Sequence, residues 1–397
     1  MTNKAYKYRI YPNHMQVQLL SKTFGGTRYA WNAWVEVFNN KNITDKKYLT
    51  AREFKRDLQW MNEISSAALQ QKERDFQVFK KQFFNKKRKK LLNKPVFKSK
   101  FDRQSYRLPN QKFDIDFNTS RIRLEKIGKV KAVFDRIIPK HARLVNATVS
   151  KTLGNDYYVS ILVEENIVLK PKTLKEVGID VGIKEFAVLS DNTVISNPHF
   201  FRENQSKLKR MQQHFFRKKK GSSHRRGCKF ALSKLQERTA RKRRHFLHEL
   251  SSKIVSTYDV IAIEDLNISG MLKNHKLAKS IQDVSWSEFL SYLQYKCEWY
   301  GKELLQVPRF YASSKTCSIC GWKNVNLTLK DRTFVCANCG QVSDRDFNAS
   351  TNILHKAKEV HILKQSAGVE AELQAWRDCQ TLAPCASADP CEVSRFL

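Results

Sequence analysis

Long hydrophobic runs are what this sequence most clearly lacks. No apolar stretch reaches the roughly 18 residues that a membrane-spanning helix requires, and this excludes an integral membrane protein of the helical kind. The first residues, 1–7 (MTNKAYK), also lack the apolar core of a secretory signal peptide. We therefore expect a cytoplasmic protein without a membrane partner.

Acidic residues are scarce as well. The chain of 397 residues has 38 Asp and Glu against 73 Lys and Arg, a formal net charge of +35. A compact chain with this charge repels itself, and a polyanionic partner would relieve that repulsion. With 41% hydrophobic residues and 24 Phe the composition is globular rather than disordered, so we expect folded domains that bind nucleic acid.

Nine cysteines are present, and four of them form two CxxC pairs. Fifteen residues separate the pairs, and Gly321 and Gly340 follow them directly. Four thiolates at this spacing predict a tetrahedral, structural Zn²⁺ site rather than redox chemistry, because four protein ligands leave no open position on the metal. The predicted zinc ligands are Cys317, Cys320, Cys336 and Cys339. We assign no role to the other cysteines near the C-terminus, Cys379, Cys385 and Cys391.

A carboxylate lies inside an apolar run at residues 178–184 (GIDVGIK). Alternating Val and Ile predict a buried strand, and residues 186–189 (FAVL) predict its hairpin partner. Burying a lone carboxylate costs several kcal/mol unless it is paired or bound to a cation (~2–7 kcal/mol for polar groups, more for charges). Asp180 is therefore either a structural hydrogen-bond acceptor or a metal ligand.

Two further acids lie at comparable positions. Glu264 ends the apolar run at residues 260–264, which predicts a second buried strand, and Asp346 follows the second CxxC pair at the start of a predicted helix. If the three carboxylates converge, they need cations between them, and two Mg²⁺ ions would neutralise them. Such a pair supports hydrolysis of a phosphodiester. We thus predict Asp180, Glu264 and Asp346 as catalytic magnesium ligands.

The positive charge is concentrated in helical segments. Between Arg202 and Glu249 there are 17 Lys or Arg and three Glu, and residues 221–223 (GSS) divide this segment into two antiparallel helices. A second basic cluster covers residues 86–90 (KKRKK). A solvated helix face is the ordinary interpretation of a charge run, but two such faces joined by one turn favour a nucleic-acid cradle.

The N-terminal part combines strands and helices. Residues 4–11 alternate apolar and basic side chains as a strand does, and short strands separated by turns are predicted from about residue 105 to 168. These strands predict a small β-barrel. Between them, apolar residues recur at helical spacing, which makes the helical region an insertion into the barrel.

Together these motifs resemble a known family. Residues 178–182 (GIDVG), 263–266 (IEDL) and 344–349 (DRDFNA), with the CxxC pairs before the last of them, resemble the RuvC-like nuclease of transposon-encoded TnpB proteins and of the related compact type V CRISPR effectors. The segment 98–105 and the basic helix pair match the family's layout too. The resemblance covers almost the whole chain.

The resemblance implies an α+β multidomain fold. An RNase H-like (RuvC) nuclease domain with an inserted zinc ribbon accompanies a wedge β-barrel that carries an inserted helical recognition domain. The implied domains are the wedge barrel at 1–12 and 101–170, the recognition domain at 13–100, the nuclease at 177–312 and 341–365, the zinc ribbon at 313–340, and a disordered tail at 366–397.

The implied function is RNA-guided cleavage of double-stranded DNA beside a short adjacent motif. A guide RNA from the transposon end is the expected partner, the protein is expected to be a monomer, and Asp180, Glu264 and Asp346 carry over as the catalytic triad. The alternatives are a guide-bound DNA-binding regulator that does not cut, a compact CRISPR effector, and a strand-joining transposase. The last is disfavoured, because transposases of that fold order their acids as Asp, Asp, Glu. One departure is Ser350, where family members usually have Ala; this small change should leave the helix intact.

Overall fold

The computed structural model describes residues 2–40, 48–85, 93–274, 277–309, 311–328 and 331–381. The basic cluster at 86–90 and the tail from 382 lie outside these residues. The chain divides into two compact units, one made of residues 1–168 and 204–241 and the other of 169–203 and 242–397. Residues 204–241, which we predicted within the nuclease domain, therefore pack with the first unit.

The first unit is built on an antiparallel, nearly closed, barrel-like sheet. Its seven strands follow the order β2-β6-β7-β1-β5-β4-β3. They are β1 (Thr2–Tyr11), β2 (Gln104–Pro109), β3 (Phe113–Asp116), β4 (Arg121–Leu124), β5 (Gly128–Val133), β6 (Arg143–Lys151) and β7 (Tyr157–Glu165), and the short helix η2 (Asn110–Lys112) joins the two edge strands. The predicted strand at residues 4–11 is present, between β7 and β5.

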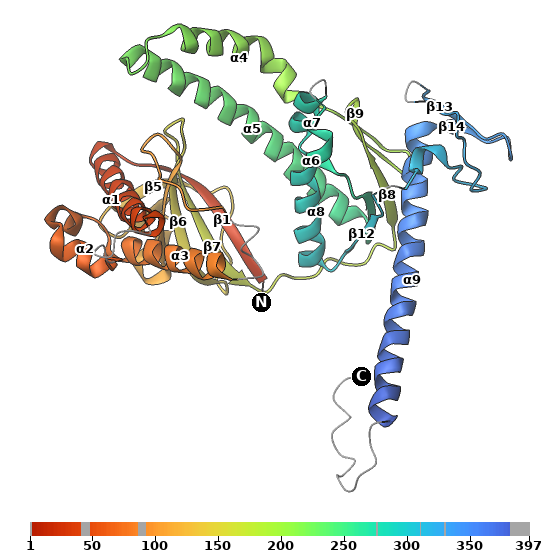
Figure 1. The fold of residues 1–397 in the computed structure, drawn as a ribbon, viewed down its shortest axis with the longest axis horizontal. Coiled ribbons are helices and arrows are strands. Elements are labelled where there is room, and N and C mark those ends of the chain that lie inside the picture. Colours follow the sequence, from red (N-terminus) through yellow and green to blue (C-terminus); the bar gives the residue numbers. More distant parts are fainter. Residues whose placement is uncertain are drawn as a thin grey trace. The chain divides into compact units, whose positions relative to one another are not determined.

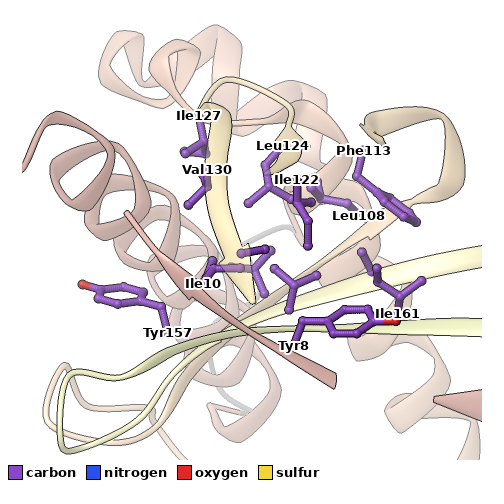
Figure 2. Close-up of a cluster of buried hydrophobic side chains, with 14 of the residues drawn as sticks. Tyr8, Ile10, Leu108, Phe113, Ile122, Leu124, Ile127, Val130, Tyr157 and Ile161 are labelled. Carbon is purple, nitrogen blue, oxygen red and sulfur yellow. The ribbon is translucent and has the colours of Figure 1, made fainter. Parts of the chain in front are cut away.

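Alternation along the strands builds the barrel's core. Tyr6, Tyr8 and Ile10 are buried while their neighbours on β1 face outward. Apolar side chains from the other strands meet them in one cluster (Figure 2). Because the period of a strand is two, this pattern fixes which face of β1 points inward, and the remaining face presents Lys7 and Arg9.

The helices between β1 and β2 form a second core. They are α1 (His14–Asn39), α2 (Ala51–Asp57), η1 (Gln59–Glu63) and α3 (Ser66–Phe84). Asn13 and Thr50 each close a capping box at the start of their helix. Trp34, Phe54 and Phe76 meet in the buried cluster, so the aromatic residues predicted on these helices serve as packing.

Two long helices form the basic hairpin, α4 (Phe200–Arg217) and α5 (Ser223–Thr257). Gly221 lies in the turn between them with φ +84°, a conformation in which glycine carries no steric penalty. In the first unit, α5 is held to the β6–β7 turn. The Arg241 guanidinium donates to Asp156 Oδ2 at 3.0 Å, and the Gly154 amide donates to Glu237 at 3.1 Å.

The second unit contains a mixed five-stranded sheet in the order β10-β9-β8-β11-β12. Its strands are β8 (Glu176–Val181), β9 (Glu185–Leu189), β10 (Val194–Ser196), β11 (Val260–Glu264) and β12 (Glu303–Val307). β8, β9 and β10 are antiparallel neighbours, whereas β11 and β12 run parallel to β8. The predicted hairpin of β8 with β9 is confirmed.

Helices cover this sheet. They are α6 (Ile268–Met271), α7 (Ala278–Val284), α8 (Trp286–Tyr300) and α9 (Arg345–Thr381), and the short η3 (Ser313–Lys315) precedes the first CxxC pair. α9 lies beside the sheet (Figure 1). Its Ile353 and Ala357 pack on Ala262 and Val307 of the sheet. α9 continues as a helix to Thr381, so its last part is not the disordered tail that we predicted from Ser366. Within the described residues, no helix is both long and apolar enough to cross a membrane.

Candidate metal centres

The pairing of β8 with β11 brings two of the predicted acids side by side. The strands are parallel, with Ala262 opposite Gly178 and Ile263 opposite Ile179. Asp180 is the residue after Ile179 on β8, and Glu264 is the residue after Ile263 on β11. Adjacent strands lie about 4.8 Å apart, and side chains in register point to the same face, so the two carboxylates lie next to one another at the carboxyl ends of their strands.

The third acid reaches this place through helix α9. Residues two apart on a strand share a face, so Asp180 points to the same side as Gly178, where α9 packs. A Cβ on Gly178 would lie 2.0 Å from the Ser350 carbonyl oxygen and 2.9 Å from the Leu354 amide nitrogen. Glycine therefore lets α9 touch β8, with Asp346 in the first turn of the helix at the same end as Asp180.

Electrostatics agree with this convergence. The pKa of Asp180 is raised well above its ordinary value, first because protein atoms surround the carboxyl and then because Glu264 and Asp346 repel its charged form. Burial likewise raises the pKa of Glu264, although a hydrogen bond from the Ser313 hydroxyl opposes the shift. Two buried acids with raised pKa values beside a third carboxylate are typical of a site completed by cations.

Two arginines pair with the third acid. The Arg345 guanidinium donates to Asp346 Oδ1 at 2.9 Å, and Arg332 lies 3.4 Å from Oδ2. The three carboxylates are near one another but do not form a closed ligand set. In the part of the chain that the structure describes, only the four cysteines bring all their ligand atoms within 4.8 Å of one another.

Those four cysteines are the predicted ones. The sulfurs of Cys317 and Cys339 are 3.7 Å apart, and those of Cys320 and Cys336 are 3.5 Å apart. A tetrahedral zinc ion with bonds near 2.3 Å separates its sulfurs by about 3.8 Å, so the residues fit zinc. Cys317 and Cys336 are buried around Phe334, whereas the other two cysteines face solvent.

The two knuckles repeat one backbone design. The Gly321 amide donates to the Cys317 carbonyl and the Gly340 amide to the Cys336 carbonyl, both at 3.0 Å. Both glycines have positive φ, 74° and 73°, which explains the residue type at these positions. Hydrogen bonds from Asn338 and the Trp322 amide lower the pKa of Cys320 to about 6, so this thiol readily supplies the thiolate that zinc binds.

The ribbon is attached directly to α9. Its strands β13 (Thr333–Val335) and β14 (Val342–Asp344) are antiparallel, and β14 ends where α9 begins. Asp344 Oδ1 accepts from the amides of Asp346 and Phe347 at 2.9 and 3.0 Å. Asp344 is thus the N-cap of α9.

Sequence reasoning missed the buried amides of α9. Asn348 accepts from the Ser318 amide at 2.9 Å and donates to the Thr316 carbonyl at 2.7 Å, and Asn352 donates to the Ser313 carbonyl at 2.8 Å. They fasten the first knuckle to the helix that carries Asp346. The one available signal was Asn348 within the motif at 344–349, to which we gave no role.

Three protein-family models and a solved structure match this chain. Residues 159–275 match a family model described as "Probable transposase", residues 286–353 match "Cas12f1-like, TNB domain", and residues 1–37 match "Helix-turn-helix domain". In this chain the last range holds the strand β1 and most of α1. A solved Cas12f1–sgRNA–target DNA complex shares the fold, with a TM-score of 0.53 at 13% identity, covering 89% of this chain and 98% of that one.

Curated relatives extend over most of the chain. A protein of Streptomyces pristinaespiralis named "Putative RNA-guided DNA endonuclease" is 35% identical over 362 residues, which is 88% of each chain. InsQ of Escherichia coli K12, named in the same way, is 30% identical over 88% of this chain and 91% of its own length. A TnpB-like protein of Methanocaldococcus jannaschii is 30% identical over 220 residues. At this identity and coverage, the chain belongs to the TnpB family that its acidic and cysteine motifs resemble.

Proposed function

We propose that this protein is an RNA-guided DNA endonuclease, with Asp180, Glu264 and Asp346 as its catalytic triad. The observation that carries the proposal is the convergence of three acids from β8, β11 and α9 on one face of the sheet, where the pKa of Asp180 is raised first by burial and then by the other two carboxylates. The sheet order, with three antiparallel strands followed by two parallel ones, supports an RNase H-like nuclease domain.

The donor set suits a hard divalent cation. Carboxylate oxygens are the ligands that Mg²⁺ prefers, and a pair of such ions would supply an activated water and charge neutralisation at the leaving oxygen. The chain's own residues position this chemistry. β8 and β11 hold two carboxylates in register, Gly178 admits α9, and the Asp344 cap and the zinc ribbon fix the turn that carries Asp346.

The partners follow from the family and from charge. The curated relatives are named for RNA guidance and DNA cleavage, and a net charge of +35 suits binding to both nucleic acids. In this mode a guide reads sequence by base pairing while the protein reads backbone shape and a short adjacent motif. We propose a guide RNA from the transposon end, double-stranded DNA as substrate, and a monomeric protein.

Cleavage of a randomised plasmid library by the protein purified with co-expressed transposon-end RNA tests the proposal. Wild type should release cut DNA in the presence of Mg²⁺. Replacing any of the three acids by Ala should slow cleavage by about 10²-fold or more, as the loss of one preorganised electrostatic group does. Asp265→Ala is the matched control, because Asp265 is the next acid after Glu264 but pairs with Arg309 at 2.8 Å.

Two results would refute the proposal. Intact DNA with every guide would favour a regulator that binds without cutting. Cleavage that persists in Asp180→Ala would show that the three acids are structural.

A further inference from the structure

An open cavity of about 600 Å³ lies in the first unit, and all the residues that line it belong to that unit. Three segments line it: the loop that leads into β2, the β6–β7 turn, and the hairpin between α4 and α5. Its lining combines cations with aromatic rings, namely Lys100, Lys151, Arg225, Arg226 and Lys229 with Phe101, Phe215 and Phe230.

The most exposed of these rings is held out by its own loop. The Phe101 side chain is 55% exposed. Its backbone is fixed, because the Ser99 hydroxyl accepts from the Phe101 amide at 3.1 Å and the Asp102 carboxylate accepts from the Ser99 amide at 2.8 Å. The Gln104 side chain donates to the carbonyls of Ser99 and Asp102 at 2.9 and 2.8 Å. The loop therefore presents an apolar ring to solvent in one preset position.

Two lysine ammonium groups, one from the loop before β2 and one from α5, lie near the Phe101 ring. The ammonium groups of Lys100 and Lys229 lie 5.2 and 5.4 Å from the Phe101 ring centroid. None of the five cations in the lining forms an ion pair with a carboxylate among the described residues; they are Lys100, Lys151, Arg225, Arg226 and Lys229. The one acid in the lining, Asp102, is already engaged by the Ser99 amide. The cavity thus offers unneutralised positive charge beside an exposed aromatic face.

Arg225 shapes the opposite wall of the cavity. The Arg225 guanidinium stacks over the Phe215 ring at 4.2 Å and donates to the Lys218 carbonyl at 2.7 Å. It thereby fastens the end of α4 to the start of α5 and holds Phe215 in place. Both walls are consequently formed before any ligand arrives, which lowers the entropic cost of binding.

We propose that this cavity binds one unstacked nucleotide of a single strand, with the base against Phe101 and the phosphate among the lysines. A volume of this size suits a small ligand and cannot admit a duplex, whose paired bases are covered by their neighbours. Base stacking on an aromatic ring combined with backbone cations is how proteins hold single strands without reading sequence. The inference rests on the proposed function only in its choice of a nucleic-acid ligand.

The test is binding of labelled oligouridine and oligothymidine to the full-length protein, freed of nucleic acid at high salt and titrated at several salt concentrations. Phe101→Ala should weaken binding by about 5- to 150-fold, the range for one lost base–aromatic stack, and Phe101→Trp should restore it. The salt slope should stay unchanged in Phe101→Ala but fall by about 0.7 in Lys229→Gln, as expected for one lost phosphate contact with a single strand.

Phe97→Ala is the control, because Phe97 is similarly exposed at 58% in the same loop region but does not line the cavity. It should bind as wild type, and Phe101→Ala should leave binding of duplex DNA unchanged. A loss confined to oligouridine would identify an RNA strand as the ligand, and one confined to oligothymidine a DNA strand. Unchanged binding of both by Phe101→Ala, or an equal loss for duplex, would overturn the proposal. Because no cleavage is measured, failure of this site and failure of the nuclease proposal are separate results.

Discussion

Gly178 offers a sharp test of how the fold assembles its acids. In Gly178→Ala the added Cβ would lie 2.0 Å from the Ser350 carbonyl oxygen and 2.9 Å from the Leu354 amide nitrogen. Both atoms belong to the backbone of α9, so no side chain can rotate away. An ordinary carbon–oxygen contact is at least about 3.4 Å, and the helix must therefore retreat from β8 by more than 1 Å or the strand must bend.

The magnitude follows from this displacement. Overpacking a well-packed interface costs about 1–3 kcal/mol of unfolding free energy. Such a cost lowers the melting temperature by about 2–4 °C per kcal/mol in a folding unit of the size of the second unit. The loss of cleavage rate should be more pronounced than the loss of stability. Asp346 moves with α9 while Asp180 and Glu264 stay on the sheet, and a misplacement near 1 Å costs about 10²-fold in rate.

Thermal unfolding and single-turnover cleavage of Gly178→Ala measure the two effects. Gly227→Ala is the matched control, because a Cβ on that glycine of α5 would meet nothing within 4 Å. It should stabilise the helix by up to about 1 kcal/mol and leave cleavage unchanged. Adding Ser350→Gly to Gly178→Ala should not rescue either property, because the obstructing atom is the main-chain oxygen. Wild-type stability and cleavage in Gly178→Ala would refute the packing argument.

Three further predictions concern the metal centres. Because the pKa of Asp180 is raised in the folded protein, its contribution to the free energy of unfolding is fully present below its ordinary pKa near 3.8 and is lost as pH rises through the higher folded value. At pH 8, Asp180→Asn should therefore melt at a higher temperature than metal-free wild type. Mg²⁺ should raise the melting temperature of wild type only, and differential scanning fluorimetry measures both effects. Equal melting of the two proteins would contradict the crowding of charge around Asp180. Asn348→Ala leaves the Ser318 amide and the Thr316 carbonyl without their partner. It should lower the free energy of unfolding, measured by chemical denaturation, by about 1–3 kcal/mol. Asn326→Ala, at an exposed position between the CxxC pairs, should lower it by less than about 0.5 kcal/mol. Cys336→Ser should abolish bound zinc measured by mass spectrometry, while Cys228→Ser, outside the ribbon, should retain it; zinc bound normally by Cys336→Ser would exclude the four-cysteine site.

Local patterns predicted what depends on local chemistry. The alternation at residues 4–11 predicted a strand with one buried face, and β1 has it. The two CxxC pairs predicted a four-sulfur cluster because ligand spacing and the following glycines are properties of each knuckle alone. The apolar run before Glu264 predicted β11. In each case the residues that determine the feature are neighbours in sequence.

Long-range packing could not be predicted in the same way. Nothing in the pattern of residues 204–241 shows that they pack with the first unit, because that depends on contacts such as Arg241 with Asp156, which are far apart in sequence. The extension of α9 to Thr381 was also missed. We took a segment rich in Ala and poor in Lys for a disordered tail, although Ala has the highest helix propensity of any residue.

Gly178 and Ser350 show why the motif around Asp180 needs more than an acid. Because Gly178 has no side chain, the backbone of α9 can approach the strand closely at this position. Ser350 is fully buried at that contact, and its hydroxyl donates to the Phe347 carbonyl at 2.8 Å within the helix. The serine therefore satisfies its own polar group without disturbing the interface, so a small side chain other than Ala is tolerated there. Glycine on the strand and a small residue on the helix are both required if acids from separate elements are to share one metal centre.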